Sequence, residues 1–428
     1  MKILWLVNIV MPELAEHLGG KPSVFGGWLE GAFKIVRDSG NELVVVSTEE
    51  NTKRAGKYEV NGVTYYITER GSEDLMRREF RKILDVEAPD VIHIYGTEFG
   101  HSWAMALESD VEKTVATIQG PLVYYKDAVF GELPEKICKD NWLHKLMRKL
   151  HKGGESIELQ KKSFEERAEL ERKTLQRLKY IHGGSEWGNA VARSVHPGCT
   201  TFDGGLILRA PFYGEERWSY ATCEKHSIYI LFSYPIKGFH QLIEALPILL
   251  ASYPDTKVHV VASKLNIRHY SKLKSRIMDK APNYHWYIQK RIEALGIGDH
   301  LVFEGYLNAE QVKSRLLKTH VFVSAAKIEN QCTALGEALI LGVPCVATFT
   351  GAIPETIEHE KSGFLYPFDS PYMLADYIKK IFDSKALAEQ FSTQGHIRSA
   401  QTYDPENNGR LLMEMYQTIH RNAKEAHS

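Results

Sequence analysis

The chain lacks the features that mark several large classes of protein. Its five cysteines are odd in number and scattered, and none of them form the CxxC spacing of a zinc site. They give no disulfide framework, so we expect a reducing compartment, most simply the cytosol. The formal net charge of -1 argues against a nucleic-acid partner. No apolar run reaches about 18 residues, the length that a membrane-spanning helix needs.

The first ten residues, MKILWLVNIV, are the one stretch with the apolar character of a signal-peptide core. Pro12, Glu13 and Glu16 follow at once, and no small-residue cleavage site appears. We therefore interpret this stretch as a first buried strand.

The length and the order of the apolar runs predict two α/β domains. A chain of 428 residues exceeds what one core usually serves, and its 43% hydrophobic and 25% charged residues are ordinary for a globular protein. Short apolar strands alternate with helices, which predicts two doubly wound parallel sheets. The predicted parts are a first domain at 1–208, a linker at 209–226, a second domain at 227–400 and a final helix at 401–428, for which the family resemblance given below implies a return to the first domain. The predicted strands lie at 1–10, 41–48, 63–68, 88–96, 113–121, 179–184, 227–234, 257–264, 300–307, 319–325 and 344–349.

In the first domain, a predicted loop at 12–25 leads to Gly26 and Gly27, which open a helix. The GxGxxG spacing of a dinucleotide site is absent, so NAD is not expected. Two interpretations of the glycine pair stay open. It either only allows close packing or, as the family resemblance given below implies, brings the backbone close to a donor phosphate.

The chemistry is expected in the stretch 321–367, VFVSAAKIENQCTALGEALILGVPCVATFTGAIPETIEHEKSGFLYP. VFVSA predicts a buried parallel strand whose carboxyl end opens onto a ligand. Glu329 follows that end, and Thr333 is expected to cap a helix that runs to about Leu341. The loop through Asn330, Gln331 and Cys332 then offers backbone N–H groups and a positive helix end, which bind phosphate well.

A second carboxylate, Glu337, lies about one turn inside that helix, which places it on the order of 10 Å from Glu329. Two carboxylates on either side of a helix start suit a nucleotide diphosphate sugar, one for sugar hydroxyls and the other for ribose hydroxyls. Gly351 to Glu355 supplies a second glycine turn beside them. The alternative is that both glutamates are ordinary solvated side chains.

The order glutamate, seven residues, glutamate, then GVPCVAT and GAIPE resembles the donor-site segment of retaining family-4 glycosyltransferases of the GT-B fold. The version here is similar to that of bacterial capsule and surface polysaccharide enzymes. The resemblance implies two Rossmann-like domains facing a cleft, a UDP or GDP sugar held by the second domain, and an acceptor held by the first. The sequence contains no D-x-D motif, which would demand a divalent metal, and no cofactor is expected.

The resemblance also implies roles for single residues. Lys237 and Gly238, in KGFHQLIEA, match the lysine and glycine with which the family holds the donor diphosphate. The arginine that usually precedes them is missing, and Phe232, Ser233 and Tyr234 stand there. His101 is expected to face the reacting centre, with a surface or packing role as the alternative. A separate departure is Gln119 with Gly120, which occupies the place of a family histidine and glycine.

The segment 142–152, WLHKLMRKLHK, predicts a basic amphipathic helix. It either attaches to an anionic membrane surface beside a lipid-linked acceptor or packs its apolar side in the core. A Lys-, Arg- and Tyr-rich insert at 265–287 gives no indication of its role.

The predicted function is transfer of a hexose from a nucleotide diphosphate sugar to a saccharide or lipid-linked acceptor, with Glu329 and His101 as catalytic residues. The donor-binding set is Gly26, Gly27, Lys237, Gly238, Asn330, Gln331, Cys332, Thr333, Glu337 and Glu355. The alternatives are a GT-B epimerase, a phosphorylase and a two-lobed sugar-binding protein. The expected location is the cytoplasm, and a peripheral position on the inner face of the membrane is the alternative.

Overall fold

The structure is a computed structural model that describes residues 1–20, 26–50, 52–150, 156–262 and 279–428. It has two compact units. Unit 1 comprises Met1–Val123, Glu166–Arg209 and Tyr403–Ser428, and unit 2 comprises Tyr124–Glu165 and Ala210–Thr402. Within the described residues, each unit contains one sheet, and the strand pairs of both sheets are parallel except for the antiparallel pair β3–β4. The predicted class of two α/β domains with parallel sheets is therefore confirmed.

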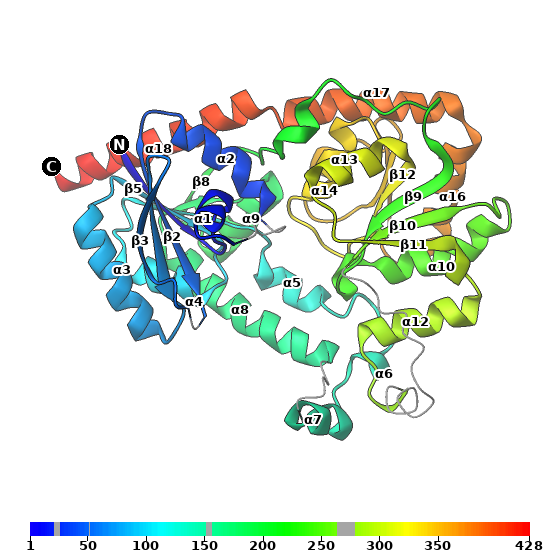
Figure 1. Cartoon of the computed structure of the whole chain (residues 1–428), viewed down its shortest axis with the longest axis horizontal. Coiled ribbons are helices and arrows are strands. Elements are labelled where there is room, and N and C mark those ends of the chain that lie inside the picture. The colour runs from blue at the N-terminus through cyan, green and yellow to red at the C-terminus, as the bar shows by residue number, and fades with distance from the viewer. Residues whose placement is uncertain (21–25, 51, 151–155, 263–278) are drawn as a thin grey trace. The chain divides into compact units, whose positions relative to one another are not determined.

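The sheet of unit 1 has the strand order β3-β4-β2-β1-β5-β6-β7-β8 (Figure 1). The central strand β1 pairs with β2 in the register Leu4↔Val44 and with β5 in the register Leu4↔Ile92. Its strands are β1 (Lys2–Val7), β2 (Glu42–Glu49), β3 (Gly56–Val60), β4 (Val63–Glu69), β5 (Val91–Tyr95), β6 (Thr114–Thr117), β7 (Tyr180–His182) and β8 (Thr200–Phe202).

Successive side chains of β1 point to opposite faces of this sheet, and each face has its own hydrophobic core. Ile3, Trp5 and Val7 join one cluster, to which α2 and α18 contribute apolar side chains. Leu4 and Leu6 join the other cluster, with side chains from α3, α4, α8 and α9. The helices of this unit are α1 (Pro12–His17), α2 (Gly27–Arg37), α3 (Glu73–Glu87), α4 (Gly100–Glu108), α8 (Ile157–Arg177, from Glu166 onward), α9 (Glu186–Val195) and α18 (Pro405–His427). Strands buried on both sides explain why the apolar runs predicted them well.

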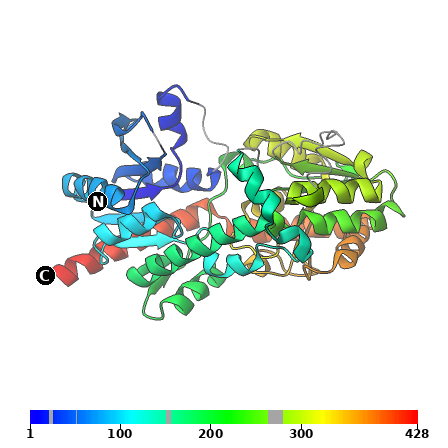
Figure 2. The ribbon, with the colours of Figure 1, turned by 90° about the horizontal axis from the view of Figure 1, so that it is seen from below.

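The last helix, α18, contacts α2 and β5. Figure 2 shows α18 as the red helix that ends at the C-terminus. Met415 and Ile419 of its predicted apolar stripe are buried. Trp5 Nε1 donates a hydrogen bond of 3.0 Å to Tyr416 Oη, which ties the last helix to the first strand.

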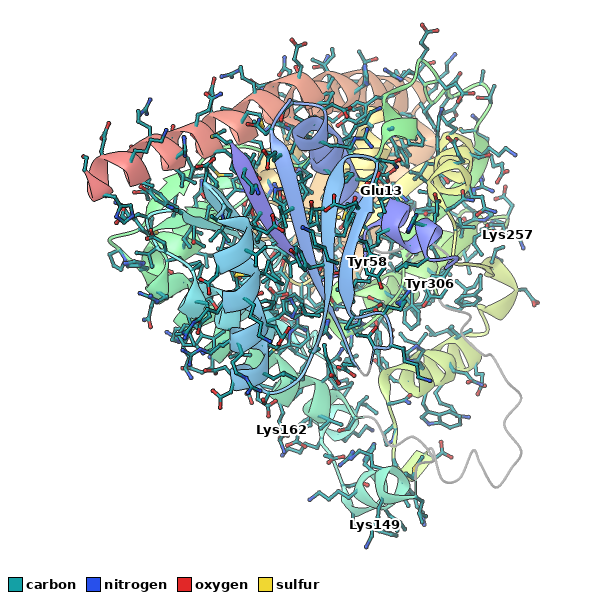
Figure 3. All side chains as sticks on the ribbon, turned by 60° about the vertical axis from the view of Figure 1, so that its left-hand side comes forward. Glu13, Tyr58, Lys149, Lys162, Lys257 and Tyr306 are labelled. Atoms are coloured by element: carbon teal, nitrogen blue, oxygen red, sulfur yellow. The ribbon has the colours of Figure 1, made fainter. Side chains whose placement is uncertain are left out.

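Several elements of unit 1, namely α1, β3, α4 and β8, were not predicted. The predicted loop at 12–25 contains α1, because Pro12 fits the first turn of a helix and Leu14 and Ala15 are buried. Strand β3 was not predicted, since its side chains are mostly exposed and carry no alternating apolar signal. The Asn61–Gly62 turn, with both residues at positive φ, is the hairpin signal that identifies it. Figure 3 shows Glu13 and Tyr58 on the neighbouring elements α1 and β3.

Unit 2 contains a six-stranded parallel sheet of order β11-β10-β9-β12-β13-β14. Its strands are β9 (Glu224–Leu231), β10 (Lys257–Val261), β11 (Leu301–Gly305), β12 (Thr319–Ser324), β13 (Cys345–Thr348) and β14 (Phe364–Tyr366). Its helices are α6 (Glu135–Cys138), α7 (Trp142–Lys149), α10 (Phe239–Leu250), α12 (Tyr284–Leu295), α13 (Ala309–Lys318), α14 (Thr333–Ile340), α15 (Ile353–Thr356), α16 (Pro371–Asp383) and α17 (Lys385–Thr402), with short 3-10 turns η1 (Ala210–Tyr213), η2 (Pro235–Lys237) and η3 (Gly298–His300). Helix α5 (Leu122–Ala128) joins this unit from Tyr124 onward.

Within the stretch 209–226, Trp218 is buried in unit 2. Its indole Nε1 donates to the carbonyl of Thr319 at 2.6 Å, and its backbone N–H donates to the carbonyl of Leu341 at 2.7 Å. Most of the insert predicted at 265–287 falls outside the described residues, and α12 occupies its end. Among the helices that the structure describes, none combines the length and the apolar character needed to cross a bilayer.

Candidate functional site

The loop that follows β12 is held in place by backbone carbonyls and neighbouring side chains. The N–H of Lys327 donates to the carbonyl of Ile236 at 2.7 Å. Thr348 Oγ1 donates to the carbonyl of Ala326 at 2.6 Å, and Thr350 Oγ1 donates to that of Lys327 at 2.8 Å. The carboxyl end of β12 is thus fixed against η2 on one side and the end of β13 on the other.

Two glycines make this arrangement possible. Gly238 has φ of 69°, and a Cβ there would lie 1.7 Å from the carbonyl oxygen of Ala325. Gly351 has φ of 50°, and a Cβ there would lie 2.0 Å from the carbonyl oxygen of Glu329. Both predicted glycines therefore let backbone approach the same loop.

Lys237 and Glu329 form an ion pair between Nζ and Oε2. Glu329 is buried, with 8% of its surface exposed. Burial alone would lower the pKa of Lys237, but the adjacent Glu329 carboxylate outweighs it and raises that pKa above its ordinary value. The lysine is therefore a permanent cation at the carboxyl ends of β9 and β12. The structure thus brings together two residues that the sequence separates by 92 positions.

Tyr125 of α5 holds this loop in place and was not predicted as a site residue. Its hydroxyl accepts a hydrogen bond of 2.6 Å from the backbone N–H of Asn330. The side chain is buried, and burial, with a further contribution from Glu329, raises the pKa of Tyr125 well above its ordinary value. A single tyrosine in α5 carries no motif that links it to a loop about 200 residues later in the chain.

The remaining predicted residues of this stretch lie on or near α14. The expected cap is wrong, because Cys332 is the N-cap and Thr333 is the first helical residue, and no side-chain hydrogen bond caps the helix. Burial and the charge of Glu329 raise the pKa of the Cys332 thiol to about 11. Glu337 is buried inside the helix, whereas Glu355 is exposed. Gln331 is half-buried.

The positions where the family arginine is missing contribute no cation. Phe232 is buried, Ser233 is exposed and Tyr234 is half-buried. Lys327, on the loop after β12, pairs with Glu132 and lies 4.9 Å from the ring of Phe368. Among the residues that the structure describes, no group of three or more His, Cys, Asp or Glu side chains is arranged to hold a metal ion.

In unit 1, the pair Gly26 and Gly27 packs tightly on side chains of that unit. Gly26 is the left-handed N-cap of α2, and a Cβ there would lie 2.2 Å from Ile9 Cδ1. A Cβ on Gly27 would lie 2.6 Å from Arg209 Cδ. Close packing alone accounts for both glycines, and their predicted role at a donor phosphate stays a prediction.

His101 lies on the first turn of α4 and is 2% exposed. Its Nδ1 is 3.3 Å from Thr48 Oγ1. Burial and the positive charge of Arg70 lower the pKa of His101 to about 3, so the imidazole is neutral. The surface role that the sequence left open is excluded, because the side chain is enclosed.

The helix predicted at 142–152 corresponds to α7, and Lys152 lies outside the described residues. Its apolar side is not in the core. Trp142 is 71% exposed, Leu146 42% and Leu150 54%. Arg148 pairs with Asp140, whereas Lys145 and Lys149 are exposed on the same surface as the apolar side chains. Figure 3 shows Lys149 on the outward side of this helix.

Comparison with known proteins first defines the class of fold. Sucrose-phosphate synthase from Thermosynechococcus elongatus superimposes with a TM-score of 0.69 at 14% identity, covering 98% of this chain and 99% of that one. HepE from Anabaena, solved with UDP and glucose, superimposes with a TM-score of 0.65 at 14% identity, covering 98% of this chain and 100% of that one. The fold is therefore GT-B, as predicted.

Sequence comparison then addresses the family. Residues 225–398 match the family Glycosyl transferases group 1. YtcC of Bacillus subtilis (strain 168), which carries a provisional glycosyltransferase name, is 24% identical over 190 residues, 43% of each chain. Thus less than half the length of this curated relative is matched. The matched segment lies within unit 2, so the sequence comparisons relate this unit to the group 1 glycosyltransferases.

Proposed function

We propose that the protein is a retaining glycosyltransferase that moves a hexose from a nucleotide diphosphate sugar to a saccharide or lipid-linked acceptor in surface polysaccharide synthesis. The observation that carries this proposal is the Lys237–Glu329 ion pair beside the two close-packed glycines. All of these residues lie within the segment 225–398 that matches the group 1 family.

A mostly buried ion pair is a weak source of stability, because desolvation of both charges offsets their attraction. In the proposal, Lys237 and Glu329 exchange each other for new partners when the donor binds. The diphosphate of a donor, UDP or GDP, would take the Lys237 ammonium as its cation. Glu329 would then accept hydrogen bonds from hydroxyls of the transferred sugar, and Glu337 from the ribose.

The residues near this pair supply the rest of the donor site in the proposal. Gly238, Asn330, Gln331, Cys332 and Thr333 place backbone groups at the start of α14, where a helix end favours the diphosphate. Catalysis would depend on positioning and on stabilising the leaving diphosphate, with no metal or other cofactor. HepE, whose structure contains UDP and glucose, is a GT-B protein with a ligand of this class.

Helix α7 belongs to unit 2, and its proposed role is to attach the protein to the membrane that carries the acceptor. Its exposed Trp142, Leu146 and Leu150, together with Lys145 and Lys149, form what we call the α7 surface. Aromatic and leucine side chains among cations favour the interface of an anionic membrane. This surface supports a lipid-linked acceptor and a peripheral position on the cytoplasmic face of the membrane.

The decisive experiment is a thermal-shift screen of UDP and GDP sugars, followed by a hydrolysis assay of each donor that stabilises the protein. We expect one base to be strongly preferred and donor turnover to require no divalent cation. Absence of any stabilisation would contradict the donor site. Donor isomerisation without an acceptor would identify an epimerase, phosphate-dependent release of sugar a phosphorylase, and binding of sugar without turnover a binding protein.

A further inference from the structure

A chain of hydrogen bonds connects Arg70 to the buried imidazole of His101. Arg70 follows β4, and its Nε donates to Thr48 Oγ1 at 3.2 Å, while its Nη2 donates to the carbonyl of Thr48 at 3.0 Å. Thr48 lies in β2, is 4% exposed, and has its hydroxyl 3.3 Å from His101 Nδ1. All three residues belong to unit 1.

The number of available protons determines the direction of the hydrogen bond between Thr48 Oγ1 and His101 Nδ1. A threonine hydroxyl has one proton to donate, and a neutral histidine has one N–H and one acceptor nitrogen. Arg70 can only donate, so it uses a lone pair of Thr48 Oγ1. Among the described residues, His101 Nδ1 is the only acceptor within reach of the Thr48 proton. The hydroxyl therefore donates to Nδ1, and the imidazole proton resides on Nε2.

His101 Nε2 is itself buried and has no hydrogen-bond partner among the residues that the structure describes. A buried N–H without an acceptor is unfavourable, so such a group in a folded protein calls for an explanation. The imidazole cannot titrate to escape this cost, because burial and the charge of Arg70 keep it neutral.

We infer that Arg70 and Thr48 are positioning residues that hold His101 in its Nε2–H tautomer, so that this N–H donates to a hydroxyl oxygen of a bound saccharide. The identity of the ligand as a saccharide rests on the proposed function, whereas the tautomer rests on the hydrogen bonds alone.

Buried oxygens at the carboxyl-end edge of the unit 1 sheet, where His101 also lies, favour a neutral, hydroxyl-bearing ligand over a phosphate. Asn8 Oδ1 and Glu98 Oε2, after the carboxyl ends of β1 and β5, are further buried oxygens without a partner among the described residues. These oxygens accept hydrogen bonds and would repel an anion, whereas a sugar hydroxyl both donates and accepts. The ring of Phe99 stacks on His101 at 5.0 Å, and Gly96 lies close to both Phe99 and Gln119. Phe99 thus lies beside the imidazole, and the unpartnered oxygens favour a ligand that donates hydrogen bonds.

The test reads the tautomer directly by long-range ¹H–¹⁵N NMR of protein labelled at histidine, with His101→Gln used to assign the signal. In the wild type we expect a neutral ring with its proton on Nε2. Thr48→Val should give a mixture of both tautomers, and Thr48→Ser should restore the wild-type pattern. Thr68→Val is the matched control, because Thr68 is a buried threonine paired with Thr48 in the sheet whose hydroxyl donates to Ser47 instead.

A proton on Nδ1 in the wild type, or an unchanged tautomer in Thr48→Val, would overturn the inference whether or not the protein transfers sugar. A kinetic measurement addresses the ligand. With the donor found in the screen, Thr48→Val should lower turnover about tenfold, the effect of one misplaced hydrogen-bond donor, while Thr68→Val and Thr48→Ser stay near wild type. Equal turnover in Thr48→Val and Thr68→Val would contradict the hydrogen bond from His101 to a saccharide. The assignment of the tautomer would not be affected.

Discussion

Tyr125 Oη accepts a 2.6 Å hydrogen bond from the backbone N–H of Asn330, and this contact fixes the loop that carries Glu329. The tyrosine is buried and comes from α5, so a residue far away in the sequence sets the conformation of the candidate donor site.

Replacement of Tyr125 by phenylalanine should therefore weaken nucleotide binding. The change removes the oxygen that accepts the hydrogen bond of the Asn330 N–H, which costs about 1–3 kcal/mol. We expect the affinity for UDP or GDP to fall by about tenfold or more in calorimetry, with a lower midpoint of thermal unfolding. Tyr124→Phe is the control, because Tyr124 is the neighbouring residue and is 45% exposed. If the two variants bind nucleotide equally, Tyr125 has no role in setting the loop.

Gly351→Ala should disrupt the site by steric conflict rather than by backbone conformation alone. The new Cβ would lie 2.0 Å from the carbonyl oxygen of Glu329, so the loop would have to move. Gly305→Ala is the matched control, because Gly305 also has positive φ, 76°, but no atom lies within 4 Å of a Cβ there. Both variants carry the left-handed strain of about 1 kcal/mol. We expect only Gly351→Ala to lose nucleotide affinity in addition, and equal losses would contradict the steric argument.

The sequence predicted the strands well and the contacts between distant loops poorly. Strands such as β1 and β12 are buried on both faces, so their apolar runs are visible without any structure. The resemblance identified Lys237 and Glu329 separately, but their ion pair depends on how β9 and β12 align in the sheet. The cap at Cys332 was not predictable from residue preference, because Thr333 is the better capping residue. Tyr125 carried no signal at all.

Glu337→Ala and Glu329→Gln should separate nucleotide binding from sugar transfer. Loss of the buried Glu337 carboxylate should weaken binding of the free nucleoside diphosphate by roughly 1.5–3 kcal/mol, because a ribose hydroxyl pair loses a charged acceptor. Glu329→Gln should lower donor turnover far more than nucleoside diphosphate affinity, since the proposed partner of Glu329 is the sugar. Calorimetry and a donor-hydrolysis assay on both variants test this division. Equal effects of Glu329→Gln on the two measurements would contradict it.

Glu171 should make the stability of the protein fall as the pH rises. Burial raises the pKa of this carboxyl group to about 8, and the nearby Glu98 adds to the shift. Thr97 Oγ1 and the N–H of Val123 donate to its oxygens, and Arg167 pairs with Glu98. The folded pKa exceeds the unfolded value of about 4.3, so the folded state binds more protons between these two pH values. Stability is therefore greatest near the lower pH and is lost towards pH 8.

The corresponding measurement is the urea midpoint of unfolding between about pH 5 and pH 8. Glu171→Gln should flatten much of the decline, because the amide keeps the shape and carries no titrating group. Glu166→Gln, at an exposed position of the same helix, should leave the decline unchanged. A wild-type slope in Glu171→Gln would show that other groups cause the dependence.

The α7 surface should bind anionic membranes reversibly. Lys145 and Lys149 would each contribute about 1 kcal/mol near an anionic leaflet, and burial of the exposed Trp142, Leu146 and Leu150 would add to that. Arg148 contributes less, because Asp140 already neutralises it. We expect cosedimentation with vesicles that contain an anionic phospholipid, and weaker cosedimentation at high salt.

The double variant Lys145→Glu with Lys149→Glu should abolish this cosedimentation and keep the midpoint of thermal unfolding, because both side chains are exposed. Lys162→Glu is the control, since Lys162 is an exposed lysine of the following helix α8 that lies outside the α7 surface (Figure 3). Trp142→Ala should weaken binding without changing its dependence on salt, because the indole contributes apolar burial and no charge. If the wild type does not bind anionic vesicles, the membrane proposal is wrong and a soluble acceptor becomes the better hypothesis.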